Sequence, residues 1–317
     1  MATTGDETLA DEQRRRIPAA VAAISAGVLT LGGGMLAAAV YSDLPDVHVL
    51  DALRERLQAG PPPEPGVKAL QVLWYHDNAV RIILVSLVLA LAAAAIGVAL
   101  THLYRSVKAR RPELQRGVVY ACVAGAVLVA VAGIVQAVAV TIKASEFAGS
   151  ANQTSDAARD ILQGPLLVAA LLLRQLGVFT FGLAFVLLAL NGMRVGLLTR
   201  FMGVLGIIVG VLFIIPLGSS LPIVQAFWLV ALGVLFLGRW PSGMPPAWGT
   251  GNAEPWPSQQ ELREARLASR AEGGSGEERP SRGAARRERT EPVETPAPEL
   301  PERRRHSSSK KRKRKRR

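Results

Sequence analysis

Six long apolar runs, separated by polar segments, define the pattern of this 317-residue chain. The first is continuously apolar from Ile17 to Val40, and about 20 such residues let a helix cross a hydrocarbon core of about 30 Å. The pattern therefore predicts an all-α, polytopic transmembrane helical bundle within residues 17–238. The six predicted spans are residues 17–40, 80–100, 117–142, 165–190, 201–217 and 222–238.

The first apolar run has an alternative interpretation as a cleaved signal peptide. Residues Ala37-Ala38-Ala39 match the small-residue pattern of a cleavage site. The apolar region of a signal peptide normally covers only about 7–15 residues, however, and this run is longer. We therefore favour an uncleaved first span that follows a polar segment, residues 1–16.

The polar connections fall into two sets on opposite sides of the membrane. Residues 1–16 share one side with the inner loops 101–116 and 191–200, and the outer loops are 41–79, 143–164 and 218–221. Before residue 239, five Lys and Arg residues lie on the outer side and ten on the inner side: Arg14, Arg15, Arg16, Arg105, Lys108, Arg110, Arg111, Arg116, Arg194 and Arg200. The positive-inside rule then predicts a plasma-membrane protein with both termini in the cytoplasm.

Two outer loops contain short helical patterns. In loop 41–79, apolar residues recur at helical spacing between Val47 and Leu57 and predict an amphipathic helix. In loop 143–164, residues 156–163 predict a short helix that ends at Gly164. The acidic residues of this second helix, Asp156 and Asp160, are more typical of a solvated helix face than of a general acid and base.

From Arg239 onward the composition changes, because Pro, Gly, Glu, Arg and Ser replace the large aliphatic residues. This composition predicts a disordered cytoplasmic tail over residues 239–317, polybasic at 303–317. The tail has 20 basic and 11 acidic residues and so carries nine of the chain's twelve net positive charges. The apolar remainder explains why the chain is 50% hydrophobic, with a mean hydropathy of +0.25.

The tail ends in eight consecutive basic residues: Lys310, Lys311, Arg312, Lys313, Arg314, Lys315, Arg316 and Arg317. Each could contribute about 1 kcal/mol to binding anionic lipid headgroups near a membrane surface. Binding to nucleic acid phosphates and a purely solubilising role are the alternatives. We favour membrane lipids as the partner, since the tail is tethered to a membrane and no aromatic residue is interleaved for base stacking.

Arg174 lies well inside the fourth apolar run, next to Gln175. A charge at the centre of a span costs about 2.5–3.5 kcal/mol on insertion scales, and such residues usually face a bundle interior or a cavity. Gln136 of the third span is predicted at a comparable depth and would be its polar partner. The alternative is that the fourth span tilts or begins late, so that Arg174 snorkels to the outer surface. Both interpretations remain open at this point.

Three glycines form a stripe on the fifth predicted span: Gly203, Gly206 and Gly210. Small residues at this spacing let two helices approach closely in a membrane. Packing within the chain is favoured over a dimer interface, and the sequence does not specify an oligomeric state.

The chain has few residue types that could support catalysis or metal binding. Cys122 is the single cysteine, and the four histidines do not share a helical face at metal-ligand spacing. The motifs of metalloproteases, serine hydrolases and nucleotide-binding enzymes are also absent from the sequence. We therefore expect a protein that is not an enzyme and that needs no metal or cofactor.

The segment Asn191-Gly-Met-Arg-Val-Gly-Leu-Leu-Thr-Arg-Phe-Met-Gly-Val-Leu-Gly-Ile-Ile-Val-Gly210, together with the basic terminus, resembles uncharacterised multi-pass membrane proteins of high-GC Gram-positive bacteria. The resemblance implies a location and an architecture but no activity. Two functions are therefore hypothesised. The first is a non-enzymatic envelope or scaffold protein whose basic tail binds anionic lipid or a partner. The alternative is a small-solute transporter or channel that uses Arg174 and Gln136.

Overall fold

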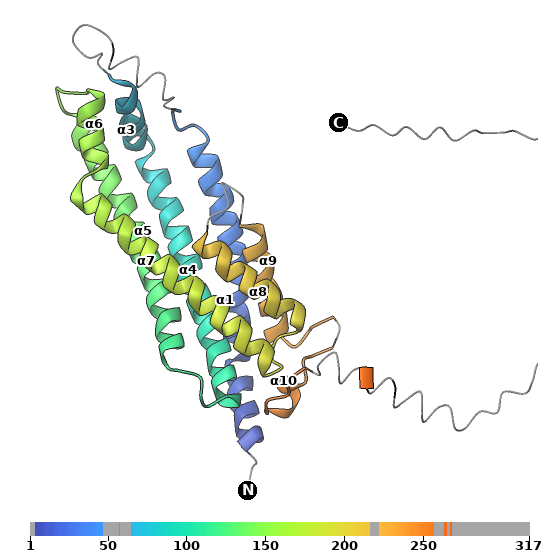
Figure 1. Cartoon of the computed structure of the whole chain (residues 1–317). Coiled ribbons are helices and arrows are strands. Elements are labelled where there is room, and N and C mark those ends of the chain that lie inside the picture. Colours follow the sequence, from blue (N-terminus) through green and yellow to red (C-terminus); the bar gives the residue numbers. More distant parts are fainter. Residues whose placement is uncertain are drawn as a thin grey trace, which may run out of the picture. The chain divides into compact units, whose positions relative to one another are not determined.

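The computed structural model describes residues 4–46, 57, 65–215, 222–241, 243–256, 263, 264 and 267. Within these residues every regular element is a helix, which confirms the predicted all-α class. Figure 1 shows the helices in chain order: α1 (Thr4–Tyr41), α3 (Val67–Asp77), α4 (Ala79–Arg110), α5 (Gly117–Ala148), α6 (Ser155–Leu162), α7 (Pro165–Arg194), α8 (Arg200–Ile214), α9 (Ile223–Phe236) and α10 (Ala247–Thr250).

Four of these helices are long and apolar enough to cross a membrane: α1, α4, α5 and α7. They contain the first four predicted spans. Each extends beyond the predicted span, because the polar residues next to the apolar run continue the same helix. In α1, for example, the polar segment before Ile17 is helical from Thr4.

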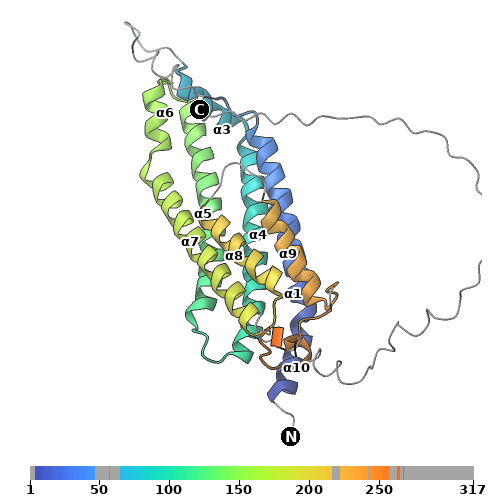
Figure 2. The ribbon, with the colours of Figure 1, turned by 45° about the vertical axis from the view of Figure 1, so that its right-hand side comes forward.

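The other two predicted spans, 201–217 and 222–238, are also helical but shorter. Helix α8 has 15 residues and α9 has 14, so they are about 22 and 21 Å long at 1.5 Å per residue. Figures 1 and 2 show that both lie along the half of the bundle nearest the N-terminus. The connection predicted at 218–221 lies outside the described residues.

The glycine stripe of α8 packs against α7. A Cβ on Gly203 would lie 2.8 Å from the Met193 Cβ, and a Cβ on Gly210 would lie 2.7 Å from the Gly182 carbonyl oxygen. A Cβ on Gly206 would meet Ala189 of α7 at 2.8 Å. All three glycines are buried within the chain. Their lack of side chains therefore permits the close approach of α7 and α8.

An aromatic cluster fills the space between α7, α8 and α9. The rings of Phe185 and Phe213 stack with centroids 5.2 Å apart, and Trp228 lies 5.3 Å from Phe185. The indole Nε1 of Trp228 donates a hydrogen bond to the Met202 carbonyl oxygen over 2.8 Å. This bond satisfies the polar atom of a fully buried side chain.

Small residues lie inside the bundle and large aliphatic residues lie outside. In α4, for example, Ala92, Ala93 and Ala99 are buried, whereas Leu84 and Leu91 are 52% and 60% exposed. Soluble proteins rarely expose so much contiguous apolar surface, but helices in lipid pack through small residues and present large ones to the hydrocarbon. The side-chain arrangement therefore agrees with the length and hydropathy of the four helices that are long and apolar enough to cross a membrane.

At the end of the bundle away from the N-terminus, α3 and α6 form a small cluster with the end of α5. Val72, Phe147 and Ala158 are buried there, and the Lys68 backbone N–H donates to the Ser155 hydroxyl over 3.1 Å. Burial raises the pKa of the Tyr75 phenol. Helix α6 confirms the short helix predicted before Gly164, whereas the amphipathic helix predicted between Val47 and Leu57 lies outside the described residues except for Leu57.

The predicted start of the tail, at Arg239, is too early. Residues 243–256 pack against the bundle, and Ala247 at the start of α10 is completely buried. Trp240, just before this segment, and Trp248 and Trp256 within it supply the apolar area that makes the packing of this otherwise polar, Pro- and Gly-rich stretch favourable. The compact unit therefore ends at Pro257 rather than at Gly238.

Candidate functional site

Four parts of the chain meet at one end of the bundle, which we call the basic end. They are the start of α1, the α4–α5 connection, the α7–α8 connection and α10, and Figures 1 and 2 both show them near the N-terminus. The ten inner-side Lys and Arg residues that the sequence predicted all belong to these parts or flank them. The arrangement brings most of the positive charge of the bundle to one end.

A buried ion pair holds the centre of the basic end. Arg110, at the end of α4, forms a bidentate pair with Glu12 of α1, in which its Nη2 lies 3.0 Å from Oε2. The same guanidinium donates to the Ala247 carbonyl oxygen of α10 and lies over the Trp248 ring, 5.6 Å from its centroid. The Arg110 side chain is completely buried. One arginine therefore links α1, α4 and α10.

Further side chains connect the region near the end of α7 to α10 and its flanks and to the α4–α5 connection. The indole nitrogens of Trp248 and Trp256 each donate a hydrogen bond of 2.8 Å, to the carbonyl oxygens of Leu197 and Leu198 respectively. Arg111 donates to the Asn191 side chain, also over 2.8 Å. These bonds satisfy backbone and side-chain groups at the ends of helices, where partners within a helix are missing.

Several basic residues predicted as a solvated loop are therefore structural. Helix α4 extends to Arg110, so much of the predicted loop 101–116 is helical. The ammonium group of Lys108 donates to the carbonyl oxygens of Pro112 and Leu114 and so closes the turn after α4. Arg105, by contrast, is exposed and makes no hydrogen bond or ion pair with another described residue.

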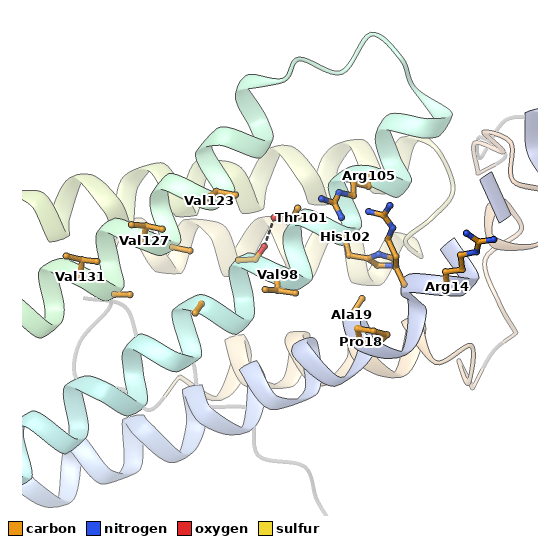
Figure 3. Close-up of a pocket in the computed structure, with 15 residues that line it drawn as sticks. Arg14, Pro18, Ala19, Val98, Thr101, His102, Arg105, Val123, Val127 and Val131 are labelled. Atoms are coloured by element: carbon orange, nitrogen blue, oxygen red, sulfur yellow. Dashed lines mark hydrogen bonds between the residues drawn. The ribbon is translucent and has the colours of Figure 1, made fainter. Parts of the chain in front are cut away.

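A cavity of about 590 Å³ opens between α1, α4 and α5 at the basic end. Figure 3 shows Arg105 and His102 at the end toward which Val131, Val127 and Val123 of α5 lead. Its lining combines arginine, histidine and small or β-branched apolar residues: Arg14, Arg15, Pro18, Ala19, Ala94, Gly97, Val98, Thr101, His102, Arg105, Val123, Ala126, Val127, Ala130 and Val131. The larger cavity is thus apolar along its length and basic at one end.

The small residues in this lining explain why the cavity exists. A Cβ on Gly97 would lie 2.8 Å from the Ala126 Cβ, so α4 and α5 nearly touch behind the cavity. The Thr101 hydroxyl does not project as a free polar group, because it donates to the Gly97 carbonyl oxygen over 2.7 Å, as Figure 3 shows. The wall between the two helices is therefore apolar.

A second cavity of about 260 Å³ shares Arg15, His102 and Arg105 with the first. Acidic residues from the start of α1 also line it: Glu7, Asp11 and Glu12. Two buried polar atoms lack a hydrogen-bond partner among the described residues there, the Nε2 of His102 and the Oγ of Ser106. Buried polar atoms are nearly always satisfied in proteins, so these two atoms mark a place where a bound molecule or water would be stabilised.

The sequence-predicted intramembrane site is not assembled in the described part of the chain. Arg174 and Gln175 are exposed on α7, and Gln136 is half-buried on α5. The contacts of Gly125 with Phe181 and of Gly177 with Leu128 set an antiparallel register. This register places Gln136 about one helical turn from the level of Arg174.

No described hydrogen bond or ion pair joins Arg174 to Gln136, and neither residue lines the two cavities. Arg174 is exposed and lies nine residues after Pro165, the first residue of α7. An exposed side chain in the outer half of its helix is compatible with the snorkelling interpretation.

The other residues singled out from the sequence are the basic terminus, Cys122 and possible metal ligands. The eight basic residues from Lys310 to Arg317 lie outside the described residues. Cys122 is buried in α5. The described residues contain no group of three or more His, Cys, Asp or Glu side chains that could hold a metal ion.

Sequence reasoning missed the cluster formed by Glu12, His102 and Arg105. These residues are far apart in the chain, and single polar residues at the ends of apolar runs look like ordinary span boundaries. One signal was present: His102 lies two residues after the predicted end of the second span and three residues before Arg105, the first basic residue of the inner loop. Only the packing of α1 against α4 turns that position into part of a cavity.

No protein-family model matches this chain, and neither a curated protein nor a solved structure is significantly similar to it.

Proposed function

We propose that this protein is a non-enzymatic scaffold of the plasma membrane whose basic cytoplasmic tail binds anionic lipid or a partner. One observation carries the proposal: the polypeptide leaves the bundle at the basic end. Glu254 donates its backbone N–H to the Val195 carbonyl oxygen over 3.1 Å, just before the compact unit ends at Pro257. The last described contact of the compact unit before Pro257 is therefore at the basic end, near the start of α1 and the inner-side arginines, as a cytoplasmic location of both termini would require.

The tethered position also favours lipid over nucleic acid as the partner of the tail. A polybasic segment that starts at a membrane surface remains within reach of anionic headgroups, which attract it within a Debye length. Binding to nucleic acid would have to compete with this local concentration of negative charge.

Deletion of residues 310–317 tests the lipid form of the proposal. The full-length protein is reconstituted in nanodiscs of neutral lipid, and the recruitment of separately added anionic liposomes is measured by flotation. Since each charge contributes about 1 kcal/mol near the surface, the deletion should weaken recruitment at least about tenfold. Recruitment should also fall with added salt. Unchanged recruitment would exclude lipid binding by the tail.

All six apolar helices are proposed to be embedded in the membrane, with α8 and α9 as a hairpin that enters from the cytoplasm. The hairpin crosses completely only if the bilayer is thinner than average around it, since helices of about 21–22 Å are shorter than a core of about 30 Å. The variant Ser219→Cys tests this point, because the one native cysteine is buried. Labelling by an impermeant maleimide from the side opposite the tail supports six crossings, whereas labelling from the tail side supports a re-entrant hairpin.

The transporter alternative has no specific observation in its favour. Its polar residues, Arg174 and Gln136, do not line a cavity described above. A translocation path needs polar groups that converge on a cavity within the bundle. The scaffold proposal is therefore preferred.

A further inference from the structure

We propose that the larger cavity binds one anionic phospholipid, with an acyl chain along its valine-lined part and the phosphate at Arg105. This site goes beyond the proposed function, because it lies in the helical bundle and does not involve the tail. The proposal rests on three features of the cavity: its apolar stripe, its unpaired positive charge, and a buried polar atom that lacks a partner.

The apolar stripe has the form of a groove for a hydrocarbon chain. Val123, Val127 and Val131 follow one another at four-residue spacing on α5, so they lie on one helical face. Each is about half exposed, at 48%, 53% and 54% respectively. Val98 of α4, which is 55% exposed, lies across from them in Figure 3. The groove is therefore open to the surrounding lipid along two spanning helices.

The larger cavity has no carboxylate in its own lining, and of the three that line the adjoining smaller cavity, Glu12 pairs with Arg110 and Asp11 with Arg15, which leaves Glu7. Arg14, Arg15 and Arg105 line the larger cavity, and its lining contains no carboxylate. Arg15 is partly neutralised, since its Nε lies 3.1 Å from a carboxylate oxygen of Asp11. Arg14 and Arg105 make no hydrogen bond or ion pair with other described residues. A phosphodiester would pair with the guanidinium group of Arg105, because guanidinium groups bind phosphate oxygens through strong, charge-assisted hydrogen bonds.

The buried His102 side chain provides an independent sign of a ligand. It is only 6% exposed, and its ring packs edge-on against Phe236 with centroids 4.8 Å apart. Its Nε2 has no hydrogen-bond partner in the described structure, and His102 is one of the residues that line both cavities. An oxygen of the lipid headgroup beside Nε2 would satisfy a polar atom that is otherwise costly to bury.

The headgroup, rather than the chain, must provide selectivity. An acyl chain gains little by moving from the bilayer into an apolar groove, because both surroundings are hydrocarbon. The groove sets where the lipid lies, and the arginines set which charge it carries. A soluble anion would use only the basic end and leave the apolar length of the cavity open.

Native mass spectrometry of the full-length protein tests the proposal. The protein is purified in detergent with equal amounts of phosphatidylglycerol and phosphatidylcholine of the same chain length. We expect one phosphatidylglycerol to be retained in preference. Arg105→Gln should weaken its retention about fivefold, the effect of one charge near a membrane surface. Val127→Trp should displace the lipid by filling the groove.

Matched controls are available outside the cavity. Arg194→Gln removes an exposed arginine from the same end of the bundle, and Val204→Trp enlarges a side chain that is 52% exposed on α8. Neither change should alter the retained lipid. Deletion of residues 310–317 should also leave it bound, so that failure of the tail proposal and failure of this one are distinguishable.

Three results would overturn the proposal. The first is equal retention of phosphatidylcholine or phosphatidylethanolamine, which would show that charge is not recognised. The second is competition by inorganic phosphate as effective as that by the lipid, which would indicate a site for a soluble anion. The third is the absence of a crosslink between the α5 peptide that contains Val127 and a photoactivatable phosphatidylglycerol whose reactive group is in its acyl chain. The proposal expects this crosslink, and without it the acyl chain does not lie in the groove.

Discussion

A buried ion pair at the basic end and an exposed ion pair at the opposite end stabilise the bundle in different ways. At the basic end, Arg110 and Glu12 are buried and join helices that are far apart in sequence. At the opposite end, Lys143 and Glu146 form a pair within one helix, with side chains 47% and 57% exposed. The first pair connects tertiary structure, whereas the second is screened by solvent and connects only adjacent turns.

The difference shows that the positive charge at one end has two separate roles. Arg110, Arg111 and Lys108 are engaged with backbone and side-chain groups and thereby hold the helix ends together. Arg14 and Arg105 remain open to the cavity. The positive-inside rule counts basic residues, and such a count does not distinguish residues that hold helix ends together from residues that line the cavity.

Breaking the buried pair should have the largest effect on stability. The substitution Arg110→Leu leaves the Glu12 carboxylate buried without its partner, and such losses typically cost about 3–5 kcal/mol. Thermal unfolding in detergent should show a clearly lower midpoint. At the opposite end, Lys143→Leu should change the free energy of unfolding by about 0–1 kcal/mol.

A double variant separates the lost attraction from the unpaired charge. If Glu12→Leu is combined with Arg110→Leu, the protein should regain part of the lost stability, because no buried charge is then left alone. Equal effects of Arg110→Leu and Lys143→Leu would contradict the proposed difference between the two ends.

Disrupting the close packing of α7 against α8 should have the next largest effect on stability. In Gly210→Ala the added methyl group would lie 2.7 Å from the Gly182 carbonyl oxygen, so α7 and α8 must separate. We expect a loss of about 1–3 kcal/mol, as for other overpacked sites. The matched control is Gly133→Ala on α5, where a Cβ meets nothing within 4 Å. If both variants unfold at the same temperature, the glycine contact is not important for stability.

Arg174→Leu should have the smallest effect. Exposed positions away from special features usually change stability within about 0.5 kcal/mol, and Arg174 is exposed. Thermal unfolding, expression level and liposome recruitment should all match the wild type. A large loss of stability, or the loss of a measured solute flux, would instead support the interior interpretation of this residue.

The sequence alone predicted a large part of the architecture. Long apolar runs predicted the helices that contain the first four spans, since only a helix can satisfy its own backbone in hydrocarbon. Residues 156–163 predicted α6 because capping and helix-ending signals are local. The tail boundary was wrong, since Trp240, Trp248 and Trp256 bind a polar-looking segment to the bundle through contacts distant in sequence.

The candidate site could not be predicted in the same way. The sequence indicated Arg174 as a candidate because a charge within an apolar run can be recognised from consecutive residues alone. In the structure its side chain is exposed. The cavity near Arg105 depends on the small residues Gly97 and Ala126, on the packing of α1 beside them, and on a carboxylate, Glu12, that neutralises Arg110 but not Arg105.

Sequence therefore determined which segments can enter a membrane, because hydropathy and helix length are properties of consecutive residues. It also determined that most basic residues lie at one end, because alternate connections face the same side. Tertiary structure alone decided which of those charges are buried and which remain open. That division depends on how closely α1, α4 and α10 pack, and a buried partner can lie more than a hundred residues away, as Ala247 does from Arg110.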